Sequence, residues 1–344
     1  MLKNYNDRLL SGHIHACILC AYRPAAGGMQ MAKLEGFLAR CQQLAEGLRY
    51  PGMPGQVSPS KRRQFVDNIS SIFLDGYDAA MHTDVERLVK QLESLSYTER
   101  SIAGEGALTA LASADLRKQN DLAQVNRFSE IAGIQESVKF QGIGSALSHL
   151  RISADVSEQH MSEFWGWQTV EAFGFHEAYF KWPVTIERQH VPDNISGLAA
   201  RAFDQGVGRA IWFISVAEPN LISTMIDRFA PKRRPDIWSG VGLITGFWGM
   251  ADERDLKALL RRSRTNYPSL QQGVAFGSWI RYTTKDPKDF AEGASRIICK
   301  ADGIWLGEQV QGIMTELLSS GMPPNGYMFS KWKESVAEIF TRPS

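Results

Sequence analysis

Two adjacent residues, His176 and Glu177, are the pair in this sequence best suited to acid–base chemistry. They interrupt a segment of small and aromatic residues, Gly174-Phe-His-Glu-Ala-Tyr179. An imidazole can take or give a proton near neutral pH, and a neighbouring carboxylate can orient it or share the proton. We therefore predict His176 as general acid or base and Glu177 as its partner. Arg209, or else Arg234, would stabilise a developing anion.

Other polar residues in similar segments are candidate ligand contacts. A small-residue helix inside a stack has few reasons to carry them unless it faces a groove, and curvature of a stack can gather them on one concave face. The candidates are Tyr179, Asp204, Gln205, Arg233, Arg234, Asp236, Ser239, Gln272 and Arg281. The alternative is structural: Asp204 or Asp236 caps a helix, and an arginine ties one repeat to the next.

The tryptophans offer a second kind of candidate. All nine lie between Trp165 and Trp332, and three further candidates, Trp212, Trp238 and Trp279, belong to repeated segments. A cavity lined by such side chains would suit a flat polyene or a fused aromatic molecule, which gains mainly from apolar burial with a few orienting polar groups. The alternative is that they fill core volume between stacked helices.

Metal and cofactor signatures are weak. His13, His15, Cys17 and Cys20 supply four possible ligands of two types that suit zinc or copper(I), but no second ligand pair follows, and reduced cysteines in a packed arm explain them as well. The glycines from Gly240 to Gly246 lack the strand and the G-x-G-x-x-G spacing of a dinucleotide loop. We assign no metal and no cofactor.

Charge and hydropathy exclude several classes of partner. Lys and Arg total 38 against 37 acidic residues, which gives no field to attract nucleic acid or an anionic membrane. No run of 18 apolar residues appears, so we expect no membrane insertion. The N-terminus lacks the basic start of a secretion signal, and four cysteines are too few for a disulfide scaffold. We expect a cytoplasmic protein.

A repeated phrase indicates the elements that position these side chains. A small residue followed by apolar or aromatic ones returns seven times, at intervals of 30 to 38 residues. The phrases begin at Gly76, Gly106, Gly144, Gly174, Gly208, Gly242 and Ala275. This period is typical of a helical hairpin. Glycine within a helix costs about 1 kcal/mol relative to alanine, so its return at one place indicates that neighbouring helices approach closely there.

Amphipathic segments lie between the phrases. Thr83 and Glu86 form the pattern of a capping box, Pro219 suits a first helical turn, and Asp252 suits an N-cap. One hairpin cannot bury its own apolar face, whereas stacked hairpins share a core. The sequence therefore predicts an all-α fold of helical-hairpin repeats stacked as an α-solenoid of the TPR or HEAT type. We expect an N-terminal arm and linker over residues 1–60 and the repeat domain over residues 61–344.

Three central blocks carry a family resemblance: Gly174 to Phe180, Phe203 to Phe213 and Arg233 to Leu243. They resemble the enediyne biosynthesis protein family, a bacterial domain of unknown function encoded in enediyne polyketide gene clusters. Weaker similarity extends the resemblance over roughly residues 60 to 320. The sequence departs from that family at Phe247-Trp-Gly249 and in its N-terminus. The resemblance implies a role in specialised-metabolite assembly, without supplying a reaction.

Two functions follow from these observations. In the first, a helical shell encloses an unsaturated polyketide-like intermediate and protects or transforms it. In the second, a concave face binds a protein partner such as a synthase, as helical-repeat surfaces commonly do. The sequence leaves open whether the protein is an enzyme.

Overall fold

The computed structural model describes residues 59–119, 121–152, 165–249, 252–284, 289–322 and 326–341. Over these ranges the chain is all-helical and contains no strand, which confirms the predicted all-α class. The four possible metal ligands His13, His15, Cys17 and Cys20 lie outside the described residues, as does the expected N-terminal arm. The first described helix begins at Pro59, close to the expected start of the repeat domain.

Seven long helices carry the seven repeated phrases. They are α3 (Pro59–His82), α5 (Tyr97–Lys118), α7 (Glu136–Leu150), α8 (Gly166–Phe180), α9 (Gly197–Ile214), α11 (Arg234–Trp248) and α13 (Tyr267–Thr284). Shorter elements connect them: α4 (Val85–Glu93), α6 (Ala123–Ala132), η3 (Pro183–Glu187), α10 (Pro219–Ile226), α12 (Glu253–Ser263) and η4 (Arg264–Asn266). The C-terminal part contains α14 (Asp289–Ala294), η5 (Ser295–Cys299), α15 (Gly303–Ser319) and α16 (Gly326–Glu338).

Glycines bring successive long helices into backbone contact, as predicted. A Cβ built on Gly208 of α9 would overlap the carbonyl oxygen of Ile237 in α11, and one on Gly240 would overlap that of Gln205. Each long helix from α3 to α13 packs against the next long helix along the chain. The missing side chains compensate for the poor helix propensity of glycine, because the two backbones can meet directly.

The long helices run in the same direction. Between α11 and α13, Ser239 bonds Gln272 near their starts, and Arg281 donates to the carbonyl of Phe247 near their ends. Apart from the connection between α7 and α8, which includes residues outside the described ranges, each return to a parallel neighbour uses one of the short connecting elements. The predicted starts of two of these, Pro219 and the N-cap Asp252, are confirmed.

The predicted capping box at the start of α4 is wrong. Asp84 is the N-cap, and its carboxylate accepts from the backbone N–H of Arg87. Thr83 instead donates its hydroxyl to the carbonyl of Ala79 in the preceding helix. A carboxylate at the N-terminus also interacts favourably with the helix dipole, which favours Asp84 over its neighbour.

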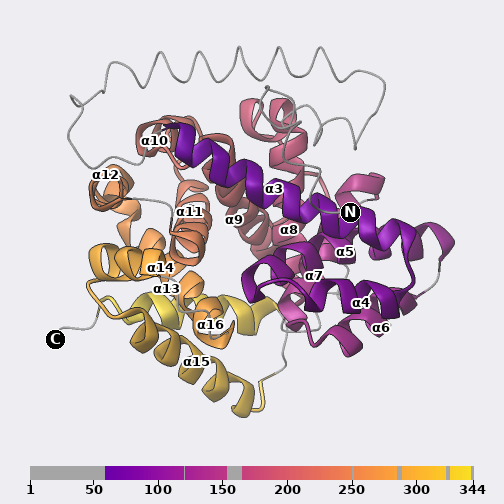
Figure 1. The fold of residues 1–344 in the computed structure, drawn as a ribbon. Coiled ribbons are helices and arrows are strands. Elements are labelled where there is room, and N and C mark those ends of the chain that lie inside the picture. Colours follow the sequence, from indigo (N-terminus) through magenta and orange to yellow (C-terminus); the bar gives the residue numbers. More distant parts are fainter. Residues whose placement is uncertain are drawn as a thin grey trace.

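The run of helices curls until its beginning meets its later part (Figure 1). Arg62 of α3 is ion-paired with Asp255 of α12, and the Phe65 ring of α3 lies 5.9 Å from that of Trp248 in α11. Gln135, just before α7, donates to Thr283 of α13 at 2.9 Å. Repeats of an open solenoid contact only their neighbours. These longer-range contacts instead enclose the space between the helices.

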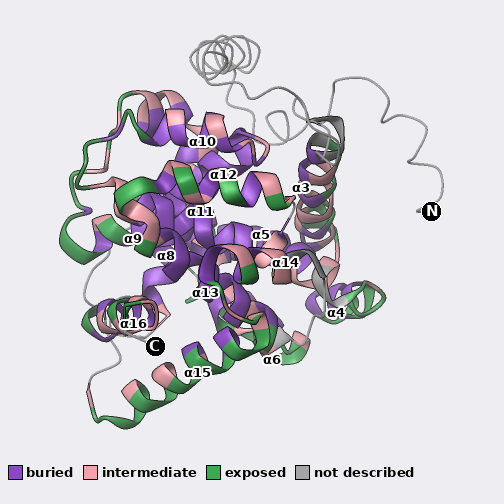
Figure 2. Cartoon of the chain, turned by 90° about the vertical axis from the view of Figure 1, so that its left-hand side faces the viewer, coloured by how far each residue is buried: buried purple, intermediate pink, exposed green. Residues whose placement is uncertain are grey.

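The central helices are covered on all sides, whereas α15 keeps one face exposed (Figure 2). Residues 202–214 of α9 and 236–246 of α11 are all buried. The C-terminal helix α16 supplies part of this cover, because its Trp332 ring stacks on Phe276 of α13 at 4.2 Å. Among the described residues, none of the helices is both long and apolar enough to cross a membrane.

Candidate functional site

A cavity of about 140 Å³ lies among the seven long helices. Its walls are mainly aromatic and aliphatic: Phe73, Phe175, Tyr179, Phe180, Phe213, Phe247 and Trp248 supply the aromatic part. An apolar cavity of about 150 Å³ can hold one benzene ring. The space therefore fits one ring or a short planar chain. The curl of the fold creates this space, because α3 and α11 are far apart in the sequence and both line it.

Two charged residues, Glu105 of α5 and Arg209 of α9, line the same cavity. Arg209 is only 6% exposed, and its Nη1 donates to Oε2 of Glu171 in α8 at 2.8 Å. The guanidinium carbon also lies 4.8 Å from the centre of the Phe175 ring. Glu171 itself is fully buried. The contacts with Glu171 and Phe175 hold Arg209 in one orientation.

Burial governs the protonation of the two carboxyls. It raises the pKa of Glu171, and the nearby Arg209 opposes that rise only in part. Burial likewise raises the pKa of Glu105, Arg209 again lowers it, and the charge of Glu171 raises it further. One guanidinium thus faces two carboxyls in a low-dielectric setting. The pair of carboxyls, Glu105 and Glu171, therefore retains a proton more readily than exposed carboxylates do.

His176 lines the cavity from α8, beside the aromatic wall. Its Nδ1 lies 2.8 Å from the hydroxyl oxygen of Ser148 in α7, and that hydroxyl donates to Oε1 of Glu177 at 2.6 Å. Because a serine has one proton to give and the carboxylate can only accept, Nδ1 of His176 must be the donor to Ser148. The Nε2 atom therefore carries the lone pair of the neutral ring.

The neutral form of His176 is strongly favoured. Burial lowers its pKa well below the usual value, and the charges of His149 and Lys181 lower it further. Glu177 was predicted as the direct partner of His176, but the two side chains are joined through the hydroxyl of Ser148. Glu177 is also ion-paired with Lys181. The structure thus brings His176, Tyr179 and Arg209 to the cavity and leaves Glu177 behind them.

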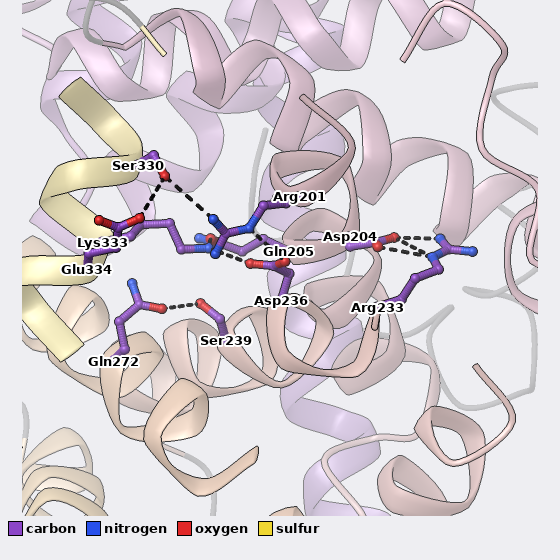
Figure 3. A network of polar contacts seen from close by, with 10 residues as sticks. All are labelled: Arg201, Asp204, Gln205, Arg233, Asp236, Ser239, Gln272, Ser330, Lys333 and Glu334. Atoms are coloured by element: carbon purple, nitrogen blue, oxygen red, sulfur yellow. Dashed lines mark hydrogen bonds and ion pairs between the residues drawn. The ribbon is translucent and has the colours of Figure 1, made fainter. Parts of the chain in front are cut away.

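Most of the predicted polar contacts instead tie helices together (Figure 3). Both oxygens of Asp204 accept from Nε of Arg233 at 3.0 Å, linking α9 to α11. Asp236 of α11 accepts from Arg201 of α9, and also from Lys333 of α16 at 3.1 Å.

Lys333 extends this network to Gln205, and a separate bond joins α11 to α13. Lys333 donates to Gln205 at 2.8 Å, and Ser239 donates to Gln272 of α13 at 2.7 Å. Asp204, Gln205, Arg233, Asp236 and Gln272 do not line this cavity, and their bonds link one helix to another, as the structural alternative describes.

The remaining candidates also lie away from the cavity. Arg234 donates to the carbonyl of Phe229, and Arg281 to that of Phe247. Trp212 and Trp238 are buried in the core, and Trp279 stacks on Trp165 at 5.5 Å while its Nε1 donates to Gln311. Among the described tryptophans, Trp248 is the one that lines the cavity.

A family model described as a protein of unknown function, DUF1702, matches residues 52–340. The chain belongs to the DUF1702 family. Neither the curated proteins nor the solved structures include a significant match to it. The DUF1702 match extends over every residue that lines the cavity, from Ile69 to Ile280.

Two acidic residues at this site, Glu105 and Glu171, were not predicted from the sequence. The signal that selected His176, a polar residue within a small-residue helix, was present for both. Glu105 stands between Gly104 and Gly106, and Glu171 lies three positions before Gly174. Ser148, which connects Glu177 to His176, carries no comparable signal. Among the described residues no cluster of His, Cys, Asp and Glu has the arrangement of a metal site.

Proposed function

We propose that this DUF1702 protein binds a small unsaturated or aromatic molecule in the cavity, as an accessory protein of enediyne- or polyketide-type metabolite assembly. The observation that carries the proposal is an aromatic-walled cavity with buried titratable groups on its wall. Ligand sites are typically concave, mostly apolar and provided with a few placed polar groups. The link to enediyne assembly is supported by the resemblance of the three central sequence blocks alone.

The apolar walls favour a flat ligand. Phe175 and Phe213 meet edge to face at 5.7 Å, and Phe247 and Trp248 at 4.6 Å. A planar conjugated molecule can stack on one ring of each pair while it contacts the edge of the other. Each Å² of apolar surface removed from water contributes roughly 25 cal/mol, so even one ring gains appreciably.

Acid–base chemistry on the bound molecule is part of the proposal. His176 would act as the general base, because its neutral ring carries the lone pair on Nε2 and lines the cavity. Arg209 would stabilise negative charge that develops on the ligand. Along α8, Glu171, the partner of Arg209, and His176 are five residues apart, about 7.5 Å of helical rise. That separation is compatible with groups at the two ends of one small conjugated ligand.

The finer description of the fold also belongs here. We propose that the hairpins form an α-solenoid whose curl has closed it around the cavity. The parallel order of the long helices supports the repeat, and the contact of α3 with α11 and α12 supports the closure. We place the protein in the cytoplasm, where polyketide intermediates are made, on the grounds of composition alone.

Mass spectrometry under non-denaturing conditions tests the binding proposal. Protein purified from a producing bacterium should carry one small molecule, which denaturing extraction releases. Ser70→Phe, which adds a ring to the α3 wall of the cavity, should abolish that mass, whereas Ser319→Phe on the exposed part of α15 should retain it. If Ser70→Phe unfolds, Ser101→Phe on α5 makes the same test. Retention of the molecule by a folded, cavity-filled variant would refute the proposal.

The catalytic part has its own experiment. His176→Asn places an amide where Nδ1 donates to Ser148 and removes the base. A producing strain that carries this variant should lose or accumulate an intermediate while the protein remains folded. A normal product profile would remove the catalytic role and leave binding alone.

One observation favours the alternative, a scaffold for a protein partner such as a synthase. On α15, Ile304 is 60% exposed and Trp305 is 44% exposed. Exposed apolar side chains of this size mark docking surfaces when they adjoin. A pull-down from the producer that retains a stoichiometric protein with wild type, but loses it with Trp305→Ser, would favour the scaffold.

A further inference from the structure

We propose that the polar end of the cavity, formed by Arg209 and Glu105, recognises the neutral carbonyl oxygen of a conjugated ligand. The inference rests on the proposed function, because it assumes that the cavity binds a small molecule, and it adds the chemical class of that molecule. Three features of the site support it: a donor of Arg209 that has no acceptor, the balanced charge around Arg209, and the aromatic walls.

Arg209 has a donor to spare. Its Nη1 is used by Glu171, but its buried Nε has no hydrogen-bond acceptor among the described residues. A buried N–H without an acceptor carries a desolvation cost that a ligand oxygen would remove. Phe175 on one side and Glu171 on the other keep the guanidinium from turning toward another acceptor. Arg209 lines the cavity, so this unused donor lies buried within the cavity wall.

The charge around Arg209 is already balanced. Glu171 neutralises it by direct contact, and Glu105 adds a second carboxyl on the cavity wall. The next buried cation, Lys333, is held by Asp236 and Gln205. Because Glu105 favours its protonated form, a ligand carboxylate would bring a second negative charge to one guanidinium, and burial of an unbalanced charge is expensive. A neutral acceptor oxygen adds no charge.

Glu105 supplies the second donor. A carboxyl group that keeps its proton donates one O–H hydrogen bond, and the surroundings of Glu105 favour that form because they are buried and contain the charge of Glu171. Two donors on one oxygen match the two lone pairs of a carbonyl, whereas an ether or a hydroxyl fits this pair less well. The aromatic walls next to it favour a carbonyl conjugated to a flat group.

Calorimetric titration of the full chain with three one-ring probes tests the inference. Acetophenone carries the conjugated carbonyl, ethylbenzene keeps the ring and the two-carbon chain without the oxygen, and benzoate carries a charge. We expect acetophenone to bind on the order of tenfold more tightly than ethylbenzene, the gain of about one hydrogen bond, and benzoate to bind most weakly.

The outcomes separate this inference from the proposed function. Equal affinity for acetophenone and ethylbenzene would overturn the carbonyl site and leave apolar binding intact. Tightest binding of benzoate would contradict the proposal that the site recognises a neutral oxygen. Failure of all three probes would sink the proposed function and the inference together.

Variants of Glu105 assign the effect to the polar end. Glu105→Leu should erase the preference for acetophenone, and Glu105→Gln, whose amide still donates, should keep most of it. Glu130→Leu, the same change at an exposed position of α6, should leave the preference as in wild type. Thermal unfolding of each variant confirms that it is folded. A preference that survives in folded Glu105→Leu would contradict the inference.

Discussion

Arg209 and Glu171 form an ion pair of 2.8 Å between α9 and α8, with side chains that are only 8% and 1% exposed. The pair lies beside the close contact of the two helices, where Gly206 leaves no room for a side chain against Glu171. Arg209 also lines the cavity, so one residue links the packing of the long helices to the proposed site.

The stability of this pair can be measured with a double-mutant cycle. Arg209→Met leaves Glu171 buried without its partner and should lower the free energy of unfolding by about 3–5 kcal/mol. Glu171→Gln in the same chain removes the stranded charge and should restore much of the loss. Urea denaturation of the four proteins gives the coupling. Additive effects of the two changes would contradict a direct pair.

An exposed pair provides the control for that cycle. Lys257 and Glu253 are ion-paired four residues apart on α12, with side chains 54% and 68% exposed. Lys257→Met should leave the denaturation midpoint close to that of wild type, because solvent and salt screen such pairs.

Glycine substitutions test the close packing of the long helices. Gly240→Ala places a methyl group against the carbonyl of Gln205 and should destabilise the protein by about 1–3 kcal/mol or more. Gly312→Ala, in the interior of α15 with no neighbour within 4 Å of its new carbon, should stabilise it by up to about 1 kcal/mol. Calorimetric melting of both variants checks the pair. A neutral Gly240→Ala would mean that α9 and α11 do not meet through backbone atoms.

The buried histidine predicts how stability depends on pH. The pKa of His176 is lowered on folding, so below about pH 6.5 the unfolded chain binds a proton that the folded one does not. Stability is unaffected by this group above that pH and falls as the pH drops through it, by up to about 1.4 kcal/mol per pH unit.

The variant His176→Asn isolates this contribution. Between pH 7 and pH 5 it should lose less stability than wild type, as measured by urea denaturation at each pH. The carboxyls Glu105 and Glu171, whose pKa values are raised, act in the opposite direction, but they are present in both proteins and largely cancel in the comparison. Parallel pH profiles would show that His176 titrates as a solvent-exposed imidazole does.

Arg233 distinguishes a structural role from a ligand-binding one. Its Nε bonds both oxygens of Asp204, and its Nη1 donates to the carbonyl of Gln189 at 2.7 Å. Arg233→Lys cannot form both contacts and should lower the melting temperature, while the affinity for a cavity ligand stays unchanged. Weakened ligand binding in a variant with wild-type stability would show that Arg233 contributes to ligand binding.

The sequence was informative about which helices are neighbours. The recurrence of Gly208 and Gly242 predicted close approach of neighbouring helices, which Gly208 makes with α11 and Gly242 with α13, and Asp252 marked the start of α12 correctly. Both inferences depend on local chemistry, either the absence of a side chain or an acceptor for free N–H groups. The long-range contact of Arg62 with Asp255, which closes the fold, leaves no such local trace.

The direction in which each side chain points was harder to foresee. Consecutive helical residues point about 100° apart, so His176 reaches the cavity while its neighbour Glu177 bonds Ser148 and Lys181 behind it. On α9, Asp204 and Arg209 are separated by five residues and serve a helix tie and the cavity respectively. A repeat pattern places residues on equivalent helices, but the closure of the fold decides which face becomes the wall.

The existence of the cavity can be tested most directly by locating xenon in a crystal of the full chain equilibrated under xenon gas. Xenon enters apolar cavities without specific contacts. We expect a xenon site among the rings of Phe73, Phe213 and Phe247. A structure in which those side chains collapse onto one another, or in which xenon binds elsewhere and leaves this space filled by protein, would contradict the existence of the cavity on which the proposed function depends.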